Sequence, residues 1–349
     1  MSWLSAFLEE EIGGDSFPGA VALVGSGEEV LELAAAGDAA REPERVAARP
    51  ETLYDLASLT KPLCCAALAR AAGWSDLQSP PGRYFEPWKR TRYDGITLEM
   101  LWTHTSGLPA WSPLYARGEG AHAYRRTLGE IEPEARPGER VIYSDLNFLL
   151  LGELLERVLS APLDRAFLDT VAAPFGSAAS FLPPEPAKTA ATERDDATER
   201  AMAAALGLDY PRFRTGIVWG AVHDGNAYRR GGVAGNAGLF GAARDVWALA
   251  RRWLTDPAED FQRDRTAALP EARGLAWQGS RGAGSAVPAF SRRAFGHTGF
   301  TGTSVWIDPD IDRIWILLTN RIHPSVRDAK FNEVRRRFHQ AAVAAAVGR

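Results

Sequence analysis

Segments typical of β-strands occur at both ends of this chain, and segments typical of helices fill most of its middle. Near the N-terminus, the apolar runs 19–24 and 29–35 flank a glycine-containing turn, which predicts an antiparallel hairpin. Near the C-terminus, the runs 305–308 and 314–319 flank a second short turn, and strands joined in this way pair antiparallel. The distribution predicts an α+β fold whose antiparallel sheet is built from the two chain ends.

Helical patterns are predicted at both termini and between the two strand pairs. They cover residues 1–15, 58–72, 97–102, 145–158 and 326–347. Residues 174–211 are rich in Pro, Ala, Glu and Thr and are interpreted mostly as a long surface excursion. We expect the terminal helices to cover the sheet, with a mainly helical subdomain inserted into the chain.

The composition argues against several classes of protein. The 349 residues contain 40 Lys and Arg against 44 Asp and Glu, and this balance argues against a nucleic-acid partner. The run Arg335-Arg336-Arg337 is interpreted as the solvated face of a helix. No stretch of about 18 apolar residues predicts a membrane span, and the N-terminus lacks the pattern of a signal peptide. The expected location is therefore the cytoplasm, without membrane contact.

The cysteines and the common binding motifs indicate neither a disulfide nor a cofactor. Cys64 and Cys65 are adjacent, which disfavours a disulfide between them and fits two buried side chains on a helix. Phosphate-binding loops, the Gly-x-Ser-x-Gly elbow and the His-Glu-x-x-His zinc motif do not occur. We therefore expect no metal ion and no cofactor, and the sequence leaves the oligomeric state open.

A serine and a lysine three residues apart, Ser58 and Lys61, form the first candidate catalytic pair. Side chains three apart share a helix face, so the Lys61 amine can reach the Ser58 hydroxyl. A serine becomes nucleophilic when a base takes its proton, and a lysine with a lowered pKa can do this. With only four lysines in the chain, about 0.2 such placements are expected by chance. An N-cap serine followed by a solvated lysine is the alternative.

Two later elements strengthen the catalytic interpretation. Tyr143 precedes the helix that starts near residue 145, and a tyrosine beside an ammonium group can relay a proton. His297-Thr298-Gly299 precedes a predicted strand, whose backbone N–H groups could face a developing oxyanion. Each element alone could be structural: Tyr143 as a half-buried strand residue, and the glycine segment as the start of a hairpin.

In this order, the three elements resemble the motifs of the serine β-lactamase-like superfamily, which includes penicillin-binding proteins, class C β-lactamases and related esterases. The matching segments are Ser58-Leu59-Thr60-Lys61, Tyr143-Ser144-Asp145 and His297-Thr298-Gly299, with 104–109, 222–227 and 231–240 as further similar segments. The resemblance spans about residues 18–324. It implies a β-lactamase/transpeptidase-like fold in one catalytic domain, with an α/β subdomain (about 1–57 and 241–349) and a helical subdomain (about 58–240).

The resemblance also implies roles for these residues. Ser58 is expected to be acylated, with Lys61 and Tyr143 sharing proton transfer. The backbone N–H groups of Ser58 and Phe300 are expected to form the oxyanion hole. The expected substrate-binding residues are Asp145, His297, Thr298 and Gly299.

Two departures from the family pattern bear on the substrate. Asp145 stands where the lactamases have Asn, and an anionic Asp145 would keep Lys61 protonated. This favours either Tyr143 as the base or a structural role for Asp145. His297 replaces the usual Lys, so a fixed cation for a substrate carboxylate is missing at that position. Asn236 stands where a histidine is usual, with no consequence that we could derive.

The resulting hypothesis is a serine hydrolase acting through an acyl-enzyme on a small ester, amide or peptide. Because of His297, an esterase ranks first and a D-amino-acid peptidase or amidase second. The alternatives are a β-lactamase or penicillin-binding protein with weak β-lactam turnover, a non-catalytic binding or sensor protein on the same fold, and an acyltransferase that shares every motif.

Overall fold

The computed structural model describes residues 2–85, 93, 95–118, 120–183, 185–327 and 330–347. Its helices are α1 (Trp3–Gly13), α2 (Ala67–Ala71), α3 (Leu98–Trp102), α4 (Gly120–Glu130), α5 (Asp145–Leu159), α6 (Leu163–Phe167), α7 (Ala197–Ala205), α8 (Gly225–Tyr228), α9 (Ala243–Thr255), α10 (Glu259–Gln262) and α11 (Phe331–Val347). Its strands are β1 (Gly19–Gly25), β2 (Val30–Ala40), β3 (Val46–Ala47), β4 (Tyr54–Asp55), β5 (Ser180–Phe181), β6 (Leu239–Gly241), β7 (Gln278–Gly279), β8 (Phe295–Thr298), β9 (Ser304–Asp308) and β10 (Arg313–Thr319).

The main sheet has seven antiparallel strands in the order β3-β2-β1-β10-β9-β8-β7. The central pair joins the two chain ends, with Leu23 opposite Ile316. Successive side chains on a strand point to opposite faces, so the apolar strands feed two separate cores. Val21 and Leu23 enter one core, whereas Ala22 and Val24 enter the other.

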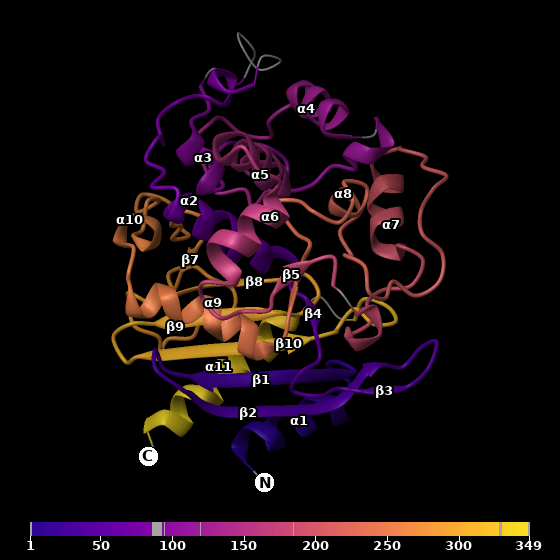
Figure 1. Ribbon diagram of the computed structural model, residues 1–349, viewed down its shortest axis with the longest axis vertical. Coiled ribbons are helices and arrows are strands. Elements are labelled where there is room, and N and C mark those ends of the chain that lie inside the picture. Colours follow the sequence, from indigo (N-terminus) through magenta and orange to yellow (C-terminus); the bar gives the residue numbers. More distant parts are fainter. Residues whose placement is uncertain are drawn as a thin grey trace.

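Helices cover both faces of this sheet (Figure 1). α1 and α11 pack on one face and place Leu8 and Phe338 in the smaller core. α9 packs on the other face and places Val246 and Leu249 in the larger core. The remaining helices lie beyond α9, away from the two termini. The expected terminal helices, both hairpins and the α+β class are therefore confirmed.

A second sheet links the middle of the chain to the segment before Ser58. Its order is β4-β6-β5. The Leu56 N–H donates to Leu239 O at 2.9 Å, and the Leu239 N–H donates to Thr60 Oγ1 at 3.2 Å. The helix expected over 58–72 begins as a 3₁₀ turn, Ala57–Leu59, continues as a π-helical segment, Lys61–Ala66, and ends with α2. The side chains of Cys64 and Cys65 are buried in this segment, as expected.

The interpretation of residues 174–211 as mostly a surface excursion is wrong for part of this segment. It contains β5 and α7, and residues 189–193 are buried. The Ala190 N–H donates to Leu53 O and the Ala191 N–H donates to Ala39 O, each at 2.8 Å. These hydrogen bonds hold the segment against the N-terminal part of the chain, which its polar composition did not reveal.

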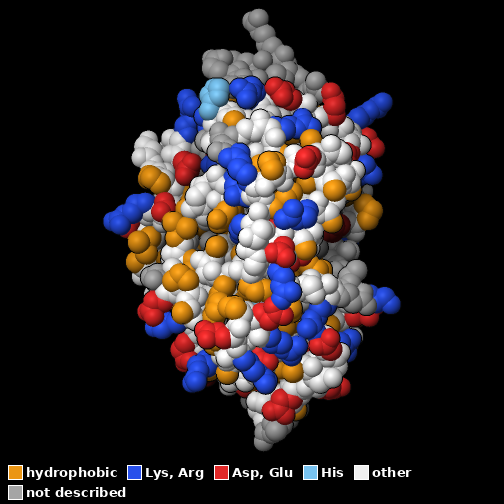
Figure 2. Space-filling model, turned by 90° about the vertical axis from the view of Figure 1, so that its right-hand side faces the viewer, with side chains coloured by type: hydrophobic (Ala, Val, Ile, Leu, Met, Phe, Trp, Pro, Cys, Tyr) orange, Lys and Arg blue, Asp and Glu red, His pale blue; other side chains and the backbone are white. Residues whose placement is uncertain are grey.

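Acidic and basic side chains are intermixed on the face shown in Figure 2. Among the residues that the structure describes, no helix combines the length and the apolar character required to cross a bilayer.

Candidate active site

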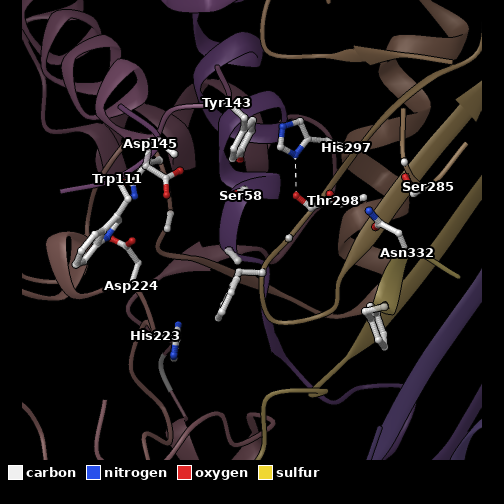
Figure 3. Close-up of a pocket in the computed structure, with 18 of the residues that line it drawn as sticks. Ser58, Trp111, Tyr143, Asp145, His223, Asp224, Ser285, His297, Thr298 and Asn332 are labelled. Atoms are coloured by element: carbon white, nitrogen blue, oxygen red, sulfur yellow. Dashed lines mark hydrogen bonds between the residues drawn. The ribbon is translucent and has the colours of Figure 1, made fainter. Parts of the chain in front are cut away.

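A cavity of about 440 Å³ opens between the Ser58 segment, the start of α5 and the end of β8. Seven of the eight predicted site residues line it: Ser58, Tyr143, Asp145, His297, Thr298, Gly299 and Phe300. The eighth, Lys61, is fully buried behind Ser58. Figure 3 shows Asp145 and Trp111 on one side of Ser58, with His297 and Thr298 on the other. The structure therefore brings all the predicted residues together, although their roles remain proposals.

Ser58 lies in the first helical turn after β4 and is half-buried, so its hydroxyl is accessible from the cavity. The preceding residue, Ala57, has a φ of +48°, a conformation that is costly for a residue with a Cβ atom. The buried Asp55 carboxylate holds this turn by accepting the Ala57 N–H at 2.9 Å and the His223 N–H at 2.7 Å. Asp55 thus links the serine turn to segment 222–227.

The Lys61 amine is hydrogen-bonded on three sides. It donates to Ser58 Oγ at 2.9 Å, to Asp145 Oδ1 at 2.5 Å and to the Asn236 carbonyl oxygen at 3.0 Å. An ammonium group has three protons to donate, so these three acceptors match its charged form. Burial lowers the pKa of Lys61, but the Asp145 carboxylate and Tyr143 outweigh burial, and the net shift is upward. Lys61 is therefore protonated at rest, as the sequence predicted from Asp145.

Tyr143 lies over the Lys61 amine, with 5.0 Å between Nζ and the ring centroid. Its hydroxyl is buried and has no hydrogen-bond partner among the described residues. Burial raises the pKa of Tyr143, while the positive charge of Lys61 opposes the rise. The structure thus places an unpaired phenol next to the serine and the ammonium group.

Segment 104–109 positions Tyr143 and the start of α5. The His104 ring lies 4.5 Å from the Tyr143 ring, and His104 Nδ1 accepts the Ser144 N–H at 3.0 Å. The His104 carbonyl oxygen accepts the Ile142 N–H at 2.8 Å, and the Pro109 carbonyl oxygen accepts the Ser144 hydroxyl at 2.5 Å. The sequence identified this segment by resemblance but assigned it no role, because its partners lie about 40 residues further along the chain.

The opposite wall is formed by β8, which carries His297. The strand predicted to follow this segment is β9, and β8 itself was not predicted. His297 Nδ1 lies 2.9 Å from Thr298 O, and since a carbonyl only accepts, Nδ1 carries the proton (Figure 3). Burial, reinforced by the charges of Lys61 and Arg273, lowers the pKa of His297 well below its usual value. The ring is therefore neutral at pH 7, in agreement with the sequence expectation.

Gly299 allows the end of β8 to approach the serine turn. A Cβ atom at this position would lie 2.2 Å from Thr303 Oγ1 and 2.7 Å from Leu56 O. Thr303 Oγ1 donates to Leu56 O at 3.1 Å, which ties the strand end to the Ser58 segment. The next N–H group, that of Phe300, makes no hydrogen bond within the described ranges and is available as the proposed oxyanion donor.

Three arginines from separate segments line the cavity: Arg273, Arg321 and Arg335. The expectation of a solvated Arg335 is wrong, because this residue is only 6% exposed. It donates to Gly299 O at 2.7 Å and to Thr303 O at 3.1 Å, and burial next to Arg321 lowers the pKa of Arg335 to about 9. Arg321 donates through Nε to Phe300 O at 3.0 Å. The sequence carried no local signal for this positive wall.

Two further acidic residues line the cavity, Glu199 on α7 and Asp224 at the start of α8. Asp224 belongs to the family-like segment 222–227, for which the sequence predicted no role. Glu199 lies in residues 174–211, which were interpreted mostly as a surface excursion. In the described part of the chain, no group of three His, Cys, Asp or Glu side chains could hold a metal ion. The cavity walls thus carry charges of opposite sign.

The comparison with known proteins shows the family of this chain. The sequence model of the family described as Beta-lactamase matches residues 4–339. The chain belongs to the β-lactamase family. A relative from Escherichia coli K12, named "Putative D-alanyl-D-alanine carboxypeptidase", is 32% identical over 324 residues, which cover 82% of this chain and 73% of that protein.

Two solved structures show the same fold. A class C β-lactamase from Rhodobacter sphaeroides superposes with a TM-score of 0.70 at 20% identity and covers 98% of both chains. EstCE1, described as a hydrolase with promiscuous acyltransferase activity, superposes with a TM-score of 0.67 at 19% identity, covering 95% of this chain and 97% of its own. The expected β-lactamase/transpeptidase-like fold is confirmed.

Proposed function

We propose that this protein is a serine hydrolase that forms an acyl-enzyme on Ser58 and hydrolyses a small amide or ester. The observation that carries the proposal is the position of the Lys61 amine, 2.9 Å from Ser58 Oγ and 2.5 Å from Asp145. The serine faces the cavity, while the lysine behind it is fully buried. A solvated lysine after an N-cap serine, the structural alternative, does not fit this geometry.

In the proposed reaction, Ser58 Oγ attacks the substrate carbonyl carbon and its proton passes to the Lys61–Tyr143 pair. The pair must first have lost one proton, so that either the phenolate or the neutral amine can accept. The N–H groups of Ser58 and Phe300 stabilise the oxyanion. The pair then protonates the leaving group, and water releases the acid from Ser58 by the same proton transfers in reverse order.

The substrate order proposed from the sequence changes once the arginines are considered. An uncharged ester ranked first because His297 is neutral. Arg321 and Arg335 line the cavity beside the end of β8 and form no ion pair within the described ranges, whereas Arg273 is paired with Glu271 at 2.5 Å. The two arginines without a carboxylate partner favour a substrate that carries a carboxylate. The name of the Escherichia coli relative supports the same class. We therefore place a short D-amino-acid peptide first and an uncharged ester second.

Mass spectrometry of the protein after treatment with a fluorophosphonate, and separately with a penicillin, tests the proposal. We expect an adduct on Ser58 and turnover of D-Ala-D-Ala peptides or p-nitrophenyl esters, both abolished in Ser58→Ala. Ser75→Ala, which removes an exposed serine outside the cavity, is the matched control. An unlabelled Ser58 with no turnover would favour a non-catalytic binding protein, and unchanged turnover by Ser58→Ala would contradict the assignment. The rate of nitrocefin hydrolysis, measured in the same way, tests the alternative of weak β-lactam turnover.

The cytoplasmic location stays a prediction, and so does the division into a helical subdomain (58–240) and an α/β subdomain (1–57 with 241–349).

The acyltransferase alternative is tested by adding an amine or an alcohol to the assay. If the acyl group is transferred, part of the product is the new amide or ester in place of the free acid.

A further inference from the structure

One wall of the cavity carries negative charge that the proposed mechanism does not use. Asp224 accepts the Ala227 N–H at 2.7 Å, but it forms no ion pair within the described ranges. Glu199 is buried and accepts the Gly225 N–H at 2.6 Å and the Tyr115 hydroxyl at 2.7 Å, and it too forms no ion pair there. Figure 3 shows Asp224 on the same side of Ser58 as Asp145 and Trp111.

The neighbouring cations are already committed to other acids. Lys61 is paired with Asp145 at 2.5 Å, and His223 Nε2 lies 2.9 Å from Glu193 Oε2. Burial raises the pKa of Asp224, and the charge of Asp145 adds to the rise. Burial and the charge of Asp224 likewise raise the pKa of Glu199 to about 7. Neither acid has a cation of the described residues as its ion-pair partner, and a bound cation would favour the ionised form of both.

An unpaired amide lies beside these acids. Asn236 is only 1% exposed, lines the cavity and interacts with Asp224. Among the described residues, neither its Oδ1 nor its Nδ2 forms a hydrogen bond of standard geometry, and Asp224 is the side chain within reach of the amide. A buried amide with such incomplete hydrogen bonding is costly, so this position indicates a ligand with polar hydrogens. Trp111 adds an aromatic ring to the same wall, and aromatic rings attract cations.

We propose that Asp224, Glu199 and Asn236 bind the free amino group of the substrate's acyl part. An alkylammonium group has three N–H donors and one charge, which the two carboxylates and the amide oxygen can accept. This inference rests on the proposed serine hydrolase function and narrows its substrate to short peptides, amides or esters with an unblocked amino terminus. Arg321 and Arg335, which line the same cavity beside the end of β8, could then receive a carboxylate of the same substrate.

A blocked amino group would not satisfy this wall. An N-acetylated substrate carries no charge at this nitrogen and has one N–H, so Asp224 would be desolvated without a cation. The added acetyl group would also have to fit between Trp111 and Asp224. The inference therefore separates two kinds of enzyme. One acts on substrates whose acyl residue has a free amino group, and the other is a carboxypeptidase that acts on longer peptides, in which that nitrogen is part of an amide bond.

Hydrolysis of alanine p-nitroanilide and its N-acetyl derivative by the full-length protein, each as the D and L forms, tests the inference. We expect kcat/KM for the free amine to exceed that for the N-acetyl form by about tenfold or more, the effect of one charge-assisted hydrogen bond. Equal or higher kcat/KM for the N-acetyl form would overturn the inference while leaving the hydrolase assignment intact. No turnover of either, with Ser58 also unlabelled by a fluorophosphonate, would instead contradict the hydrolase itself.

The variant Asp224→Asn tests whether the preference for the free amine over the N-acetyl substrate arises at Asp224. Asn still provides an oxygen for the Ala227 N–H at the start of α8, so the helix cap is kept. We expect the ratio of the two kcat/KM values to fall about tenfold in this variant. The matched control, Asp209→Asn, changes an exposed carboxylate outside the cavity and leaves the ratio unchanged. Glu199→Gln is the second variant if Asp224→Asn does not fold, and an unaltered ratio in a folded variant would contradict the proposal.

Discussion

Lys61 and Asp145 form an ion pair of 2.5 Å in which the lysine is fully buried and the carboxylate still lines the cavity. The pair joins the first residue of the π-helical segment Lys61–Ala66 to the first residue of α5, 84 positions further along the chain. It keeps the amine next to the nucleophile in its charged form, because the net pKa of Lys61 is raised. The Lys61–Tyr143 pair must therefore lose a proton before it can accept the proton of the Ser58 hydroxyl.

This dependence predicts an alkaline pH profile that Asp145 controls. The pKa values of both Lys61 and Tyr143 are raised, and Asp145 contributes to each rise, so kcat/KM should increase with pH above neutrality. In Asp145→Asn both pKa values fall, and the rising limb should move to lower pH by about one unit or more. Asp169→Asn removes the acid of an exposed ion pair and is the control. If the rising limb of the pH profile stayed at the same pH in Asp145→Asn, a group other than the Lys61–Tyr143 pair would control the pH dependence.

Tyr143→Phe should lower kcat by about 10²- to 10⁴-fold, the range expected for losing a proton-transfer group. The substitution keeps the ring that packs 4.5 Å from His104 and removes only the hydroxyl. Tyr210→Phe is the matched control, since Tyr210 also has a buried hydroxyl without a partner among the described residues but does not line the cavity. Stopped assays at several pH values measure the effect, and similar losses in both variants would indicate a structural role for the hydroxyl.

Arg321→Gln should weaken the binding of substrates that carry a carboxylate. Within the described structure, the Arg321 side chain makes a hydrogen bond only through Nε, to Phe300 O, so its two Nη groups can still donate to a ligand. We expect KM for D-Ala-D-Ala to rise about tenfold while KM for its C-terminal amide changes little. Arg321→Lys should recover part of the difference because it keeps the charge. A parallel rise for both substrates would show that Arg321 only supports the turn at Phe300.

The features that followed from the sequence are those encoded by nearby residues. The strand pairs follow from alternating apolar residues next to tight turns, and the Ser58–Lys61 contact spans a single helical turn. The contact of Lys61 with Asp145 could not be derived from spacing. It was expected only because the ordered motifs resemble a known family.

The features that the sequence missed depend on backbone groups far away in the chain. A run of three arginines on an amphipathic helix indicates a solvated face, and Arg336 and Arg337 agree with this interpretation. Arg335 is buried because the carbonyl oxygens of Gly299 and Thr303 accept its guanidinium protons. Nothing in residues 326–347 shows that such carbonyls lie opposite this helix. Glu199 was missed for the same reason, since its partners come from α8 and Tyr115.

Gly299→Ala tests whether the close approach of β8 to the serine turn is required for catalysis. The added Cβ would lie 2.2 Å from Thr303 Oγ1, 2.7 Å from Leu56 O and 3.2 Å from Ala57 Cβ, so the strand end must move away from the turn. The Phe300 N–H moves with it, and we expect kcat to fall about 10²-fold, the loss typical of one oxyanion donor. Circular dichroism should show that the fold is kept.

Gly13→Ala serves as the control for this substitution, because a Cβ at Gly13 meets no atom within 4 Å. It should leave kcat unchanged. If Gly299→Ala were folded and fully active, the Phe300 N–H would not be the oxyanion donor, because a displaced N–H could not hold the same transition state. If KM rose while kcat stayed constant, the strand end would contribute to substrate binding alone, and the oxyanion hole would have to be sought among other backbone groups near Ser58.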